Sequence, residues 1–176
     1  QTSEISNAVQ RLSRFYKLTL SRKNSISTIG DEEEHVSIYL QIQNMRYHNS
    51  ISFISDIPDE LTEYQLPKLT LQPVIENSVL HGILEKSSKS GTIVLTGWME
   101  DPDIVLLISD DGVGIPPEKL TDIISGTETV SGKGTNIAVY NTHRRLQILY
   151  GSSYGLSYTS QPGQGTEVQI RIPAIK

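Results

Sequence analysis

The sequence contains no cysteine, so disulfide bonds, thiol catalysis and thiolate metal sites are all excluded. It also lacks an apolar run of the roughly 18 to 20 residues that a membrane-spanning helix requires, and it has no signal peptide. Basic residues are fewer than acidic ones, 15 against 20, and the formal net charge is −5. This balance, without any long basic run, argues against nucleic acid or an anionic membrane surface as the main partner.

The chain does have the length of one domain of ordinary size, or of one domain with a helical appendage. Leu, Ile and Val are frequent along its 176 residues, so a real hydrophobic core can form. The first residue is Gln1 and not Met. We therefore expect a processed product or a piece of a longer protein.

Helical periodicity is clear in the first part of the chain. Apolar residues recur at steps of three and four from Ser3 to about Ser21, which predicts an amphipathic helix that is half-exposed without a partner. Asp31 and Glu34 match a capping box. The acidic residues between them suit a first helical turn because of the helix dipole. A second helix is therefore expected from this point to about Tyr47.

Apolar alternation and short apolar runs predict strands at residues 51–57, 91–99, 103–109, 154–159 and 166–172. The run Ile104–Ile108 is continuous and is typical of a central strand buried on both faces. Short helices are expected from Pro116 to about Ser125 and from Asn136 to Tyr150. Between them, residues 126–135 are rich in Gly, Ser and Thr, which predicts a mobile loop.

Two adjacent carboxylates, Asp110 and Asp111, end a predicted buried strand and precede Gly112 and Gly114. Glycine lets the backbone approach a ligand closely because it has no side chain. A carboxylate held beside such backbone is well placed to accept a hydrogen bond from an exocyclic amine. Taken alone, the same residues also fit an ordinary turn.

A third helix is expected between Pro67 and Gly82, with a kink or restart at Pro73. Glu76, Asn77 and His81 interrupt its apolar pattern, and such residues are costly to bury without a partner. The oxygen of an Asn side chain can join phosphate oxygens and waters around Mg²⁺. The alternatives are a satisfied buried hydrogen bond for Asn77 and His81, and a surface position for Glu76.

A glycine-rich segment, Gly132-Lys133-Gly134-Thr135, leads into the helix expected near Asn136. Free backbone amides at a helix start beside a glycine loop form an anion-binding arrangement. A disordered surface loop is the alternative. The later segment Gly163-Gln164-Gly165-Thr166 fits a plain hairpin turn when taken alone.

In this order, the four blocks resemble the N, G1 and G2 boxes and the terminal Gly-x-Gly-Thr of the ATP-binding fold shared by gyrase, Hsp90 chaperones, histidine kinases and MutL proteins. Within that group the chain resembles LytS/YehU-like bacterial sensor histidine kinases over nearly its whole length. The segments that carry this resemblance are Leu71–Gly82, Tyr39–Gln43 with Arg46, Arg145-Leu146 and Leu149–Gly151.

The resemblance implies an α+β fold: a two-layer α/β sandwich of the Bergerat type, with a mixed sheet, helices on one face, and ATP between the N-box helix and a lid. It also implies two parts. Residues 1–30 would be the second dimerisation helix, or its continuation, with a linker. Residues 31–176 would be the ATP-binding catalytic domain.

By the same resemblance, Asp110 would bind the adenine amino group, and Thr166 would support this contact through water. Gly112 and Gly114 would let the chain pass the nucleotide. These four positions match the family motifs residue by residue.

The remaining site residues implied by the resemblance lie around the phosphates. Asn77 would coordinate Mg²⁺, and Glu76 would sit beside the attacking or metal-bound groups. His81 and Lys133 would lie near the phosphates. Phosphoryl transfer mainly requires positioning and charge neutralisation, so this set is chemically sufficient once an acceptor is delivered.

The chain departs from the family pattern at two places. Leu80 stands where the family usually has Lys, which removes one possible phosphate contact. Asn136 and Ala138 replace two glycines of the G2 box, which narrows the backbone conformations available there. Only Gly132 and Gly134 remain to serve the lid.

The resemblance implies the cytoplasmic catalytic portion of a two-component sensor histidine kinase. It would transfer the γ-phosphoryl group of Mg-ATP to a His that precedes Gln1, and from there to an Asp of a response regulator. The intact protein would be a homodimer, held together through helices that are partly missing here and anchored in the cell membrane by an upstream region. None of the chain's four histidines, His35, His48, His81 and His143, is expected to be the acceptor.

Two alternatives stay open at this point. Leu80, Asn136 and Ala138 are compatible with a nucleotide-binding or dimer-interaction module that has lost turnover. An ATP-hydrolysing machine of the gyrase or Hsp90 type would need no acceptor His. The short length and the segment from Tyr39 to Arg46 argue against this second alternative.

Overall fold

The computed structural model describes residues 2–20, 25–125 and 134–176. Its α-helices are α1 (Thr2–Leu20), α2 (Ile29–Arg46), α3 (Leu71–Asn77), α4 (Pro117–Ser125) and α5 (Gly134–Tyr150). A 3₁₀ turn η1 (Asp59–Leu61) and a π-helical segment η2 (Ser78–Ile83) complete the helical part. The strands are β1 (Ile26–Thr28), β2 (Ile51–Asp56), β3 (Gln65–Pro67), β4 (Gly91–Glu100), β5 (Asp103–Asp110), β6 (Gly155–Gln161) and β7 (Gly165–Pro173).

Five of the strands form one mixed sheet in the order β2-β4-β5-β7-β6. β2 runs parallel to β4, and the other neighbours are antiparallel. The register places Asp110 on β5 opposite Thr166 on β7, and Thr166 opposite Ser160 on β6. Three polar side chains therefore form a row across one end of the sheet.

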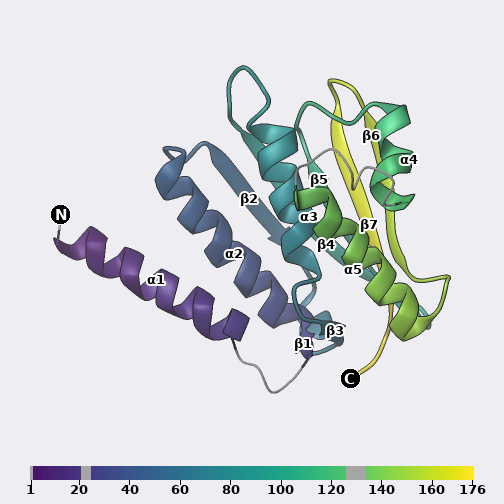
Figure 1. Cartoon of the computed structure of the whole chain (residues 1–176). Coiled ribbons are helices and arrows are strands. Elements are labelled where there is room, and N and C mark those ends of the chain that lie inside the picture. The colour runs from purple at the N-terminus through teal and green to yellow at the C-terminus, as the bar shows by residue number, and fades with distance from the viewer. Residues whose placement is uncertain (1, 21–24, 126–133) are drawn as a thin grey trace.

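Helices α2, α3 and α5 lie across one face of this sheet (Figure 1), which makes the predicted two-layer sandwich. The inward residues of β5, Ile104, Leu106 and Ile108, are fully buried. They join a core that includes Leu40, Leu71, Ile75, Leu146, Val168 and Ile170 from the helices and from β7. At about 25 cal/mol per Å² of buried apolar surface, this layer contact is the main stabilising contribution to the fold.

Helix α1 packs against α2 along one side. The Phe15 ring stacks on the His35 ring with centroids 4.6 Å apart, and Arg14 forms an ion pair with Glu34. The other side of α1 leaves apolar side chains exposed, as its periodicity predicts, at Val9, Leu12 and Tyr16. No helix in the three described ranges is both long and apolar enough to cross a membrane.

The predicted start of the second helix is wrong. Helix α2 begins at Ile29, and its N-cap is Thr28, whose hydroxyl accepts a hydrogen bond from the Asp31 amide at 3.2 Å. The expected capping box of Asp31 and Glu34 is not used, because strand β1 leads directly into the helix and Ile29 is fully buried in the core.

The predicted helix start at Pro67 is also wrong. Pro67 ends strand β3, where it pairs with Ile26 of β1, and its carbonyl accepts a hydrogen bond from the Thr70 hydroxyl at 2.6 Å. Helix α3 then begins at Leu71. Pro73 lies in the first turn, where its missing amide hydrogen costs no helical hydrogen bond, and the irregularity comes later, in the π-helical segment η2.

Candidate functional site

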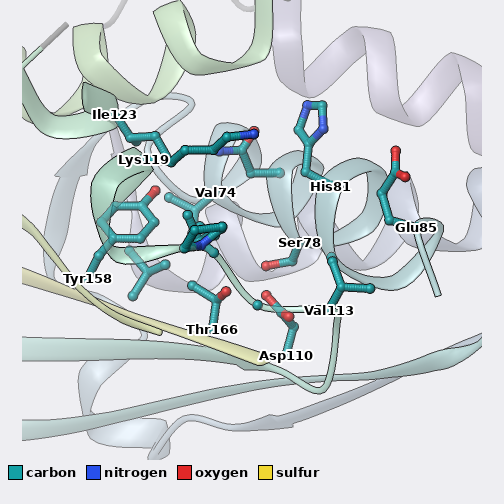
Figure 2. Close-up of a pocket in the computed structure, with 16 residues that line it drawn as sticks. Val74, Ser78, His81, Glu85, Asp110, Val113, Lys119, Ile123, Tyr158 and Thr166 are labelled. Carbon is teal, nitrogen blue, oxygen red and sulfur yellow. The ribbon is translucent and has the colours of Figure 1, made fainter. Parts of the chain in front are cut away.

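A cavity of about 600 Å³ lies between the α3–η2 segment and the sheet, with α4 along another side (Figure 2). Five residues predicted from the sequence line it together: Asn77, His81, Asp110, Gly114 and Thr166. They come from distant parts of the chain. The fold therefore unites the N-box helix, the end of β5 and the start of β7 in one site.

Asp110 lies at the sheet side of the cavity and is only 7% exposed. Its carboxylate Oδ1 accepts a hydrogen bond from the Gly112 amide at 2.9 Å. Burial raises the pKa of this carboxyl, whereas hydrogen bonds from Ser78, Gly112 and the Thr166 backbone lower it. Burial has the largest effect, so the pKa of Asp110 is raised overall, and the hydrogen bonds from these donors offset only part of that rise.

The neighbouring Asp111 has a different position. Its Oδ1 accepts a hydrogen bond from the Thr92 amide at 2.9 Å and lies 3.3 Å from the Lys86 ammonium. It does not line the cavity. The structure therefore separates the two adjacent carboxylates: Asp110 faces the cavity, and Asp111 connects Lys86 and the start of β4 to the end of β5.

The glycines after Asp111 permit close backbone packing. A Cβ atom on Gly112 would lie 2.4 Å from the Cα of Gly82. Gly114 has a φ of 73°, and its Cβ would lie 2.1 Å from the Gln161 carbonyl oxygen. Both close approaches are to protein backbone. The role of these glycines beside a nucleotide stays a prediction, and Gly112 itself does not line the cavity.

Asn77 is the last residue of α3 and is 9% exposed. Within the described part of the chain, its buried Oδ1 has no hydrogen-bond partner. Burial raises the pKa of Tyr158, and the adjacent Asn77 side chain partly lowers it. An unpaired amide oxygen at a cavity wall is costly, and it suits a cation or donor brought by a ligand.

The described residues contain no cluster of three or more His, Asp or Glu side chains that could hold a metal ion. Mg²⁺ does not require such a cluster, because it keeps several waters and uses few protein ligands together with substrate phosphates. Asn77 Oδ1 fits that limited role. Asn77 is thus a candidate protein ligand for Mg²⁺.

His81 and Lys119 face the cavity from the helical side, opposite Asp110 and Thr166 (Figure 2). Leu80 does not line the cavity and packs against the hydrophobic core. In this chain, the position at which the family usually has Lys is therefore partly buried against the core and not at the cavity wall. Lys119 on α4 brings a positive charge to the cavity instead.

Glu76 lies on another side of α3. It does not line the cavity, and its Oε1 accepts a hydrogen bond from Gln72 Nε2 at 2.6 Å. Its charge acts on Tyr39 of α2, because burial and then Glu76 raise the pKa of that hydroxyl. The contribution of Glu76 to catalysis stays a prediction, and this structure places it toward α2.

The proposed lid residues can be placed only in part. Gly132 and Lys133 lie outside the described residues. Gly134 is the first residue of α5, two residues before the start predicted at Asn136. Most of the predicted mobile loop, residues 126–135, also lies outside the residues that the structure describes.

Sequence reasoning missed four polar residues of the cavity wall: Ser78, Glu85, Lys119 and Tyr158. Tyr158 could have been found, because it alternates with polar Ser157 and Thr159 on a predicted strand. Ser78 follows Asn77 directly and could have been inferred from the N-box block. Lys119 carries no local signal, since only the packing of α4 brings it to the site.

A buried carboxylate on α2 caps the start of α3. Glu32 is 3% exposed, and it accepts hydrogen bonds from the amides of Leu69, Thr70 and Leu71 at 2.8, 2.9 and 3.2 Å. Burial raises the pKa of Glu32, and these hydrogen bonds lower it. The orientation of the helix that carries Asn77 thus depends on a residue 37 to 39 positions earlier in the chain.

Arg145 of α5 reaches the same place. Its Nη2 donates to the Leu69 carbonyl and to the Thr70 hydroxyl, both at 3.3 Å. The charge of Glu32 acts on it and raises its pKa, although burial has the larger effect and lowers it. Three helices, α2, α3 and α5, are therefore connected at one buried polar cluster.

Two family models match the chain. Residues 66–176 match the model described as "Histidine kinase-, DNA gyrase B-, and HSP90-like ATPase", and residues 1–51 match "Histidine kinase". Among curated relatives, the sensor histidine kinase BtsS of Escherichia coli K12 is 31% identical over 172 residues, which are 98% of this chain and 28% of that protein. The sensor histidine kinase YesM of Bacillus subtilis is 30% identical over 173 residues, which are 98% of this chain and 28% of that protein.

The chain thus spans about 28% of the length of these relatives. Solved structures agree with the fold. The histidine kinase domain from Erythrobacter litoralis EL346 superposes with a TM-score of 0.60 at 20% identity, over 96% of this chain and 74% of that one. The catalytic domain of histidine kinase ThkA gives 0.63 at 17% identity, over 87% of this chain and 100% of that one.

Proposed function

Since the chain belongs to the family of histidine kinase-, DNA gyrase B-, and HSP90-like ATPases, we propose that its cavity binds Mg-ATP for phosphoryl transfer to a histidine. The observation that carries this proposal is the pairing of two unusual groups across one cavity. Asp110 is a buried carboxylate on the sheet side, and Asn77 presents a buried, unpaired oxygen on the helical side.

The sheet side would hold the adenine. The Asp110 carboxylate is an acceptor whose existing hydrogen bonds hold it in place, and an exocyclic amine is the matching donor. Thr166 lies directly opposite on β7 and lines the same wall. This arrangement supports an assignment of the amino edge of the base to this end of the cavity.

The helical side would hold the phosphates. Asn77 would bind Mg²⁺, which when bound neutralises phosphate charge. His81 and Lys119 line this side and would contact phosphate oxygens, as would Lys133 from the lid. These residues would keep the γ-phosphoryl group in line with an incoming nitrogen, and positioning of this kind accounts for much of the rate of such reactions.

The reaction would break the bond between the γ-phosphorus and the bridging oxygen, release ADP, and form a bond to a histidine nitrogen. We propose that this histidine precedes residue 1 and that an Asp of a response regulator then receives the phosphoryl group. We also propose that the whole protein is a homodimer anchored in the cell membrane, as the resemblance to sensor histidine kinases implies.

Calorimetric titration with Mg-ADP tests the site. Asp110→Asn keeps the shape but turns an acceptor into a donor, a loss of about 1.5 to 3 kcal/mol for a charge-assisted bond. The affinity should fall at least about tenfold. Asp111→Asn is the matched control, because this neighbouring carboxylate faces away from the cavity. Equal affinity of the wild type and Asp110→Asn would refute the adenine assignment.

Incubation with γ-labelled ATP tests the transfer. The present chain should bind ATP without labelling any of its four histidines, and a longer chain with the upstream helix should gain an acid-labile, base-stable label there. Label on His35 would overturn the placement of the acceptor. Binding without label in the longer chain would favour the alternative of a module without turnover, which the inward packing of Leu80 also favours.

A further inference from the structure

The polar row across the sheet ends on Ser160 of β6, which the proposed function does not use. Its hydroxyl oxygen lies 2.8 Å from the Gly165 carbonyl oxygen and 2.9 Å from the Thr166 hydroxyl oxygen. The Ile115 amide donates to the same oxygen at 2.8 Å. Ser160 therefore has three hydrogen-bond partners, and two of them belong to segments that line the cavity.

Proton counting decides the direction of the contact between the two hydroxyls. A serine hydroxyl has one proton to donate and two lone pairs to accept with. The Gly165 carbonyl can only accept, so it takes the Ser160 proton. The Ile115 amide can only donate, so it takes one lone pair. The remaining lone pair of Ser160 must accept the proton of Thr166.

This direction determines what Thr166 presents to a ligand. Its only hydroxyl proton is engaged with Ser160, so the oxygen faces the cavity with lone pairs alone. Figure 2 shows Thr166 and Asp110 next to each other on the sheet side of the cavity. The Asp110 carboxylate, with hydrogen bonds from Ser78, Gly112 and the Thr166 amide, is also an acceptor. This wall of the cavity therefore offers two neighbouring acceptors.

We propose that Ser160 is a specificity-determining positioning residue. By accepting a hydrogen bond from the Thr166 hydroxyl, it leaves only hydrogen-bond acceptors at the base end of the cavity, which selects a 6-amino purine over a 6-oxo purine. The inference rests on the proposed nucleotide site. A 6-oxo group would face two acceptors, and a site whose buried polar groups are left unpaired rejects such an analogue strongly. Ser160 acts through Thr166 and need not touch the base.

Inosine diphosphate is the suitable probe, because its base carries a 6-oxo group in place of the 6-amino group of adenine, with a proton on N1, and leaves the ribose and phosphates unchanged. Calorimetry gives the affinities of Mg-ADP and Mg-IDP, and the ratio of the two is the readout. The wild type should prefer ADP by about a hundredfold or more. In Ser160→Ala the Thr166 hydroxyl is free to donate to a 6-oxo group, so this ratio should fall about tenfold.

A double-mutant cycle makes the test specific to Thr166. Thr166→Val should lower the ratio on its own, and adding Ser160→Ala to it should then change the ratio no further. Ser160→Thr keeps a hydroxyl, so the ratio should stay at the wild-type value. Ser157→Ala, an exposed position on the same strand, is the matched control and should leave the ratio unchanged.

Two outcomes would overturn the inference. If Ser160→Ala weakens ADP and IDP by the same factor, Ser160 only supports the structure. If the wild type binds both nucleotides equally, this wall of the cavity does not distinguish a 6-amino group from a 6-oxo group. A wild type that binds neither nucleotide refutes the proposed function itself, and the inference fails with it. The first two outcomes leave nucleotide binding intact, so the two failures are distinguishable.

Discussion

The two ends of the cavity differ in how completely their polar groups are paired. At the sheet end, the carboxylate of Asp110 and the hydroxyls of Ser160 and Thr166 have partners within the protein. At the helical end, the buried Oδ1 of Asn77 has none within the described ranges. The sheet end is therefore preorganised before any ligand arrives, whereas the helical end becomes satisfied only when a ligand brings a cation or a donor.

The two ends also differ in what supports them. Three antiparallel strands hold the sheet end in register. The helical end is carried by α3, only seven residues long, and by a π-helical segment, and a side chain from another helix caps its start. From this difference we expect the sheet end to tolerate changes elsewhere in the fold and the helical end to depend on Glu32.

The largest expected effect is on stability at the helical end. Glu32→Ala leaves the amides of Leu69, Thr70 and Leu71 without their acceptor, which should cost at least about 3 kcal/mol of the free energy of unfolding. Urea denaturation measures this loss. Glu33→Ala is the neighbouring control and should change stability by no more than about 0.5 kcal/mol. Similar stabilities of the two variants would show that the cap does not support α3.

A smaller effect should separate the two ends by their response to Mg²⁺. In the wild type, Mg²⁺ should raise the affinity for ADP about tenfold, and Asn77→Ala should abolish that gain with little change in the metal-free affinity. Calorimetry with Mg²⁺ and with EDTA compares the two. Asn77→Asp keeps a ligand oxygen and should keep the metal effect. A full Mg²⁺ response in Asn77→Ala would remove Asn77 from the metal site.

The smallest effect should be a pH dependence at the start of β6, at the opposite end of that strand from Ser160. His143 Nδ1 accepts a hydrogen bond from the Leu156 amide of β6 at 3.0 Å, and burial lowers the pKa of His143. The unfolded chain therefore binds a proton more readily, so stability is lost as the pH falls below about 6.5. Burial also lowers the pKa of His35, which adds to the same loss.

His143→Asn isolates that contribution, because the Asn side chain offers an acceptor at the same place that does not titrate. Urea denaturation at pH 7.5 and at pH 5.5 should show a smaller loss of stability in the variant than in the wild type. His35 titrates in both proteins, so it contributes equally to the change of the free energy of unfolding with pH in each. An identical slope in the two proteins would contradict a role for His143.

Much of the fold could be predicted from local patterns. Alternating and continuous apolar runs indicated the strands that became β2, β4, β5, β6 and β7, close to their observed bounds. The ordered glycine and carboxylate blocks indicated the ATP-binding fold, and the family models and solved structures confirm the family and the fold class. Such patterns are reliable because the period of a segment follows from the face that it must bury.

Element starts and side-chain directions were harder to predict. The capping box at Asp31 is a valid local pattern, but Ile29 is buried and β1 leads directly into the helix, so the helix starts at Ile29 with Thr28 as its N-cap. Glu76 and Asn77 are adjacent in one motif, and the structure directs Glu76 toward α2 and Asn77 into the cavity. Competing partners outside the local segment made these choices.

The chemical groups of the site were therefore present in the sequence, because the N, G1 and terminal blocks supply an amide, a carboxylate and glycines in a recognisable order. The direction of each hydrogen bond depended on the assembled fold. Glu32 reaches amides 37 to 39 residues away, and Ser160 meets Thr166 only because β6 pairs with β7 in one register. A hydroxyl or a carboxylate has the same chemistry in any chain, but whether it donates or accepts, and to what, depends on neighbours that only folding brings within hydrogen-bond distance.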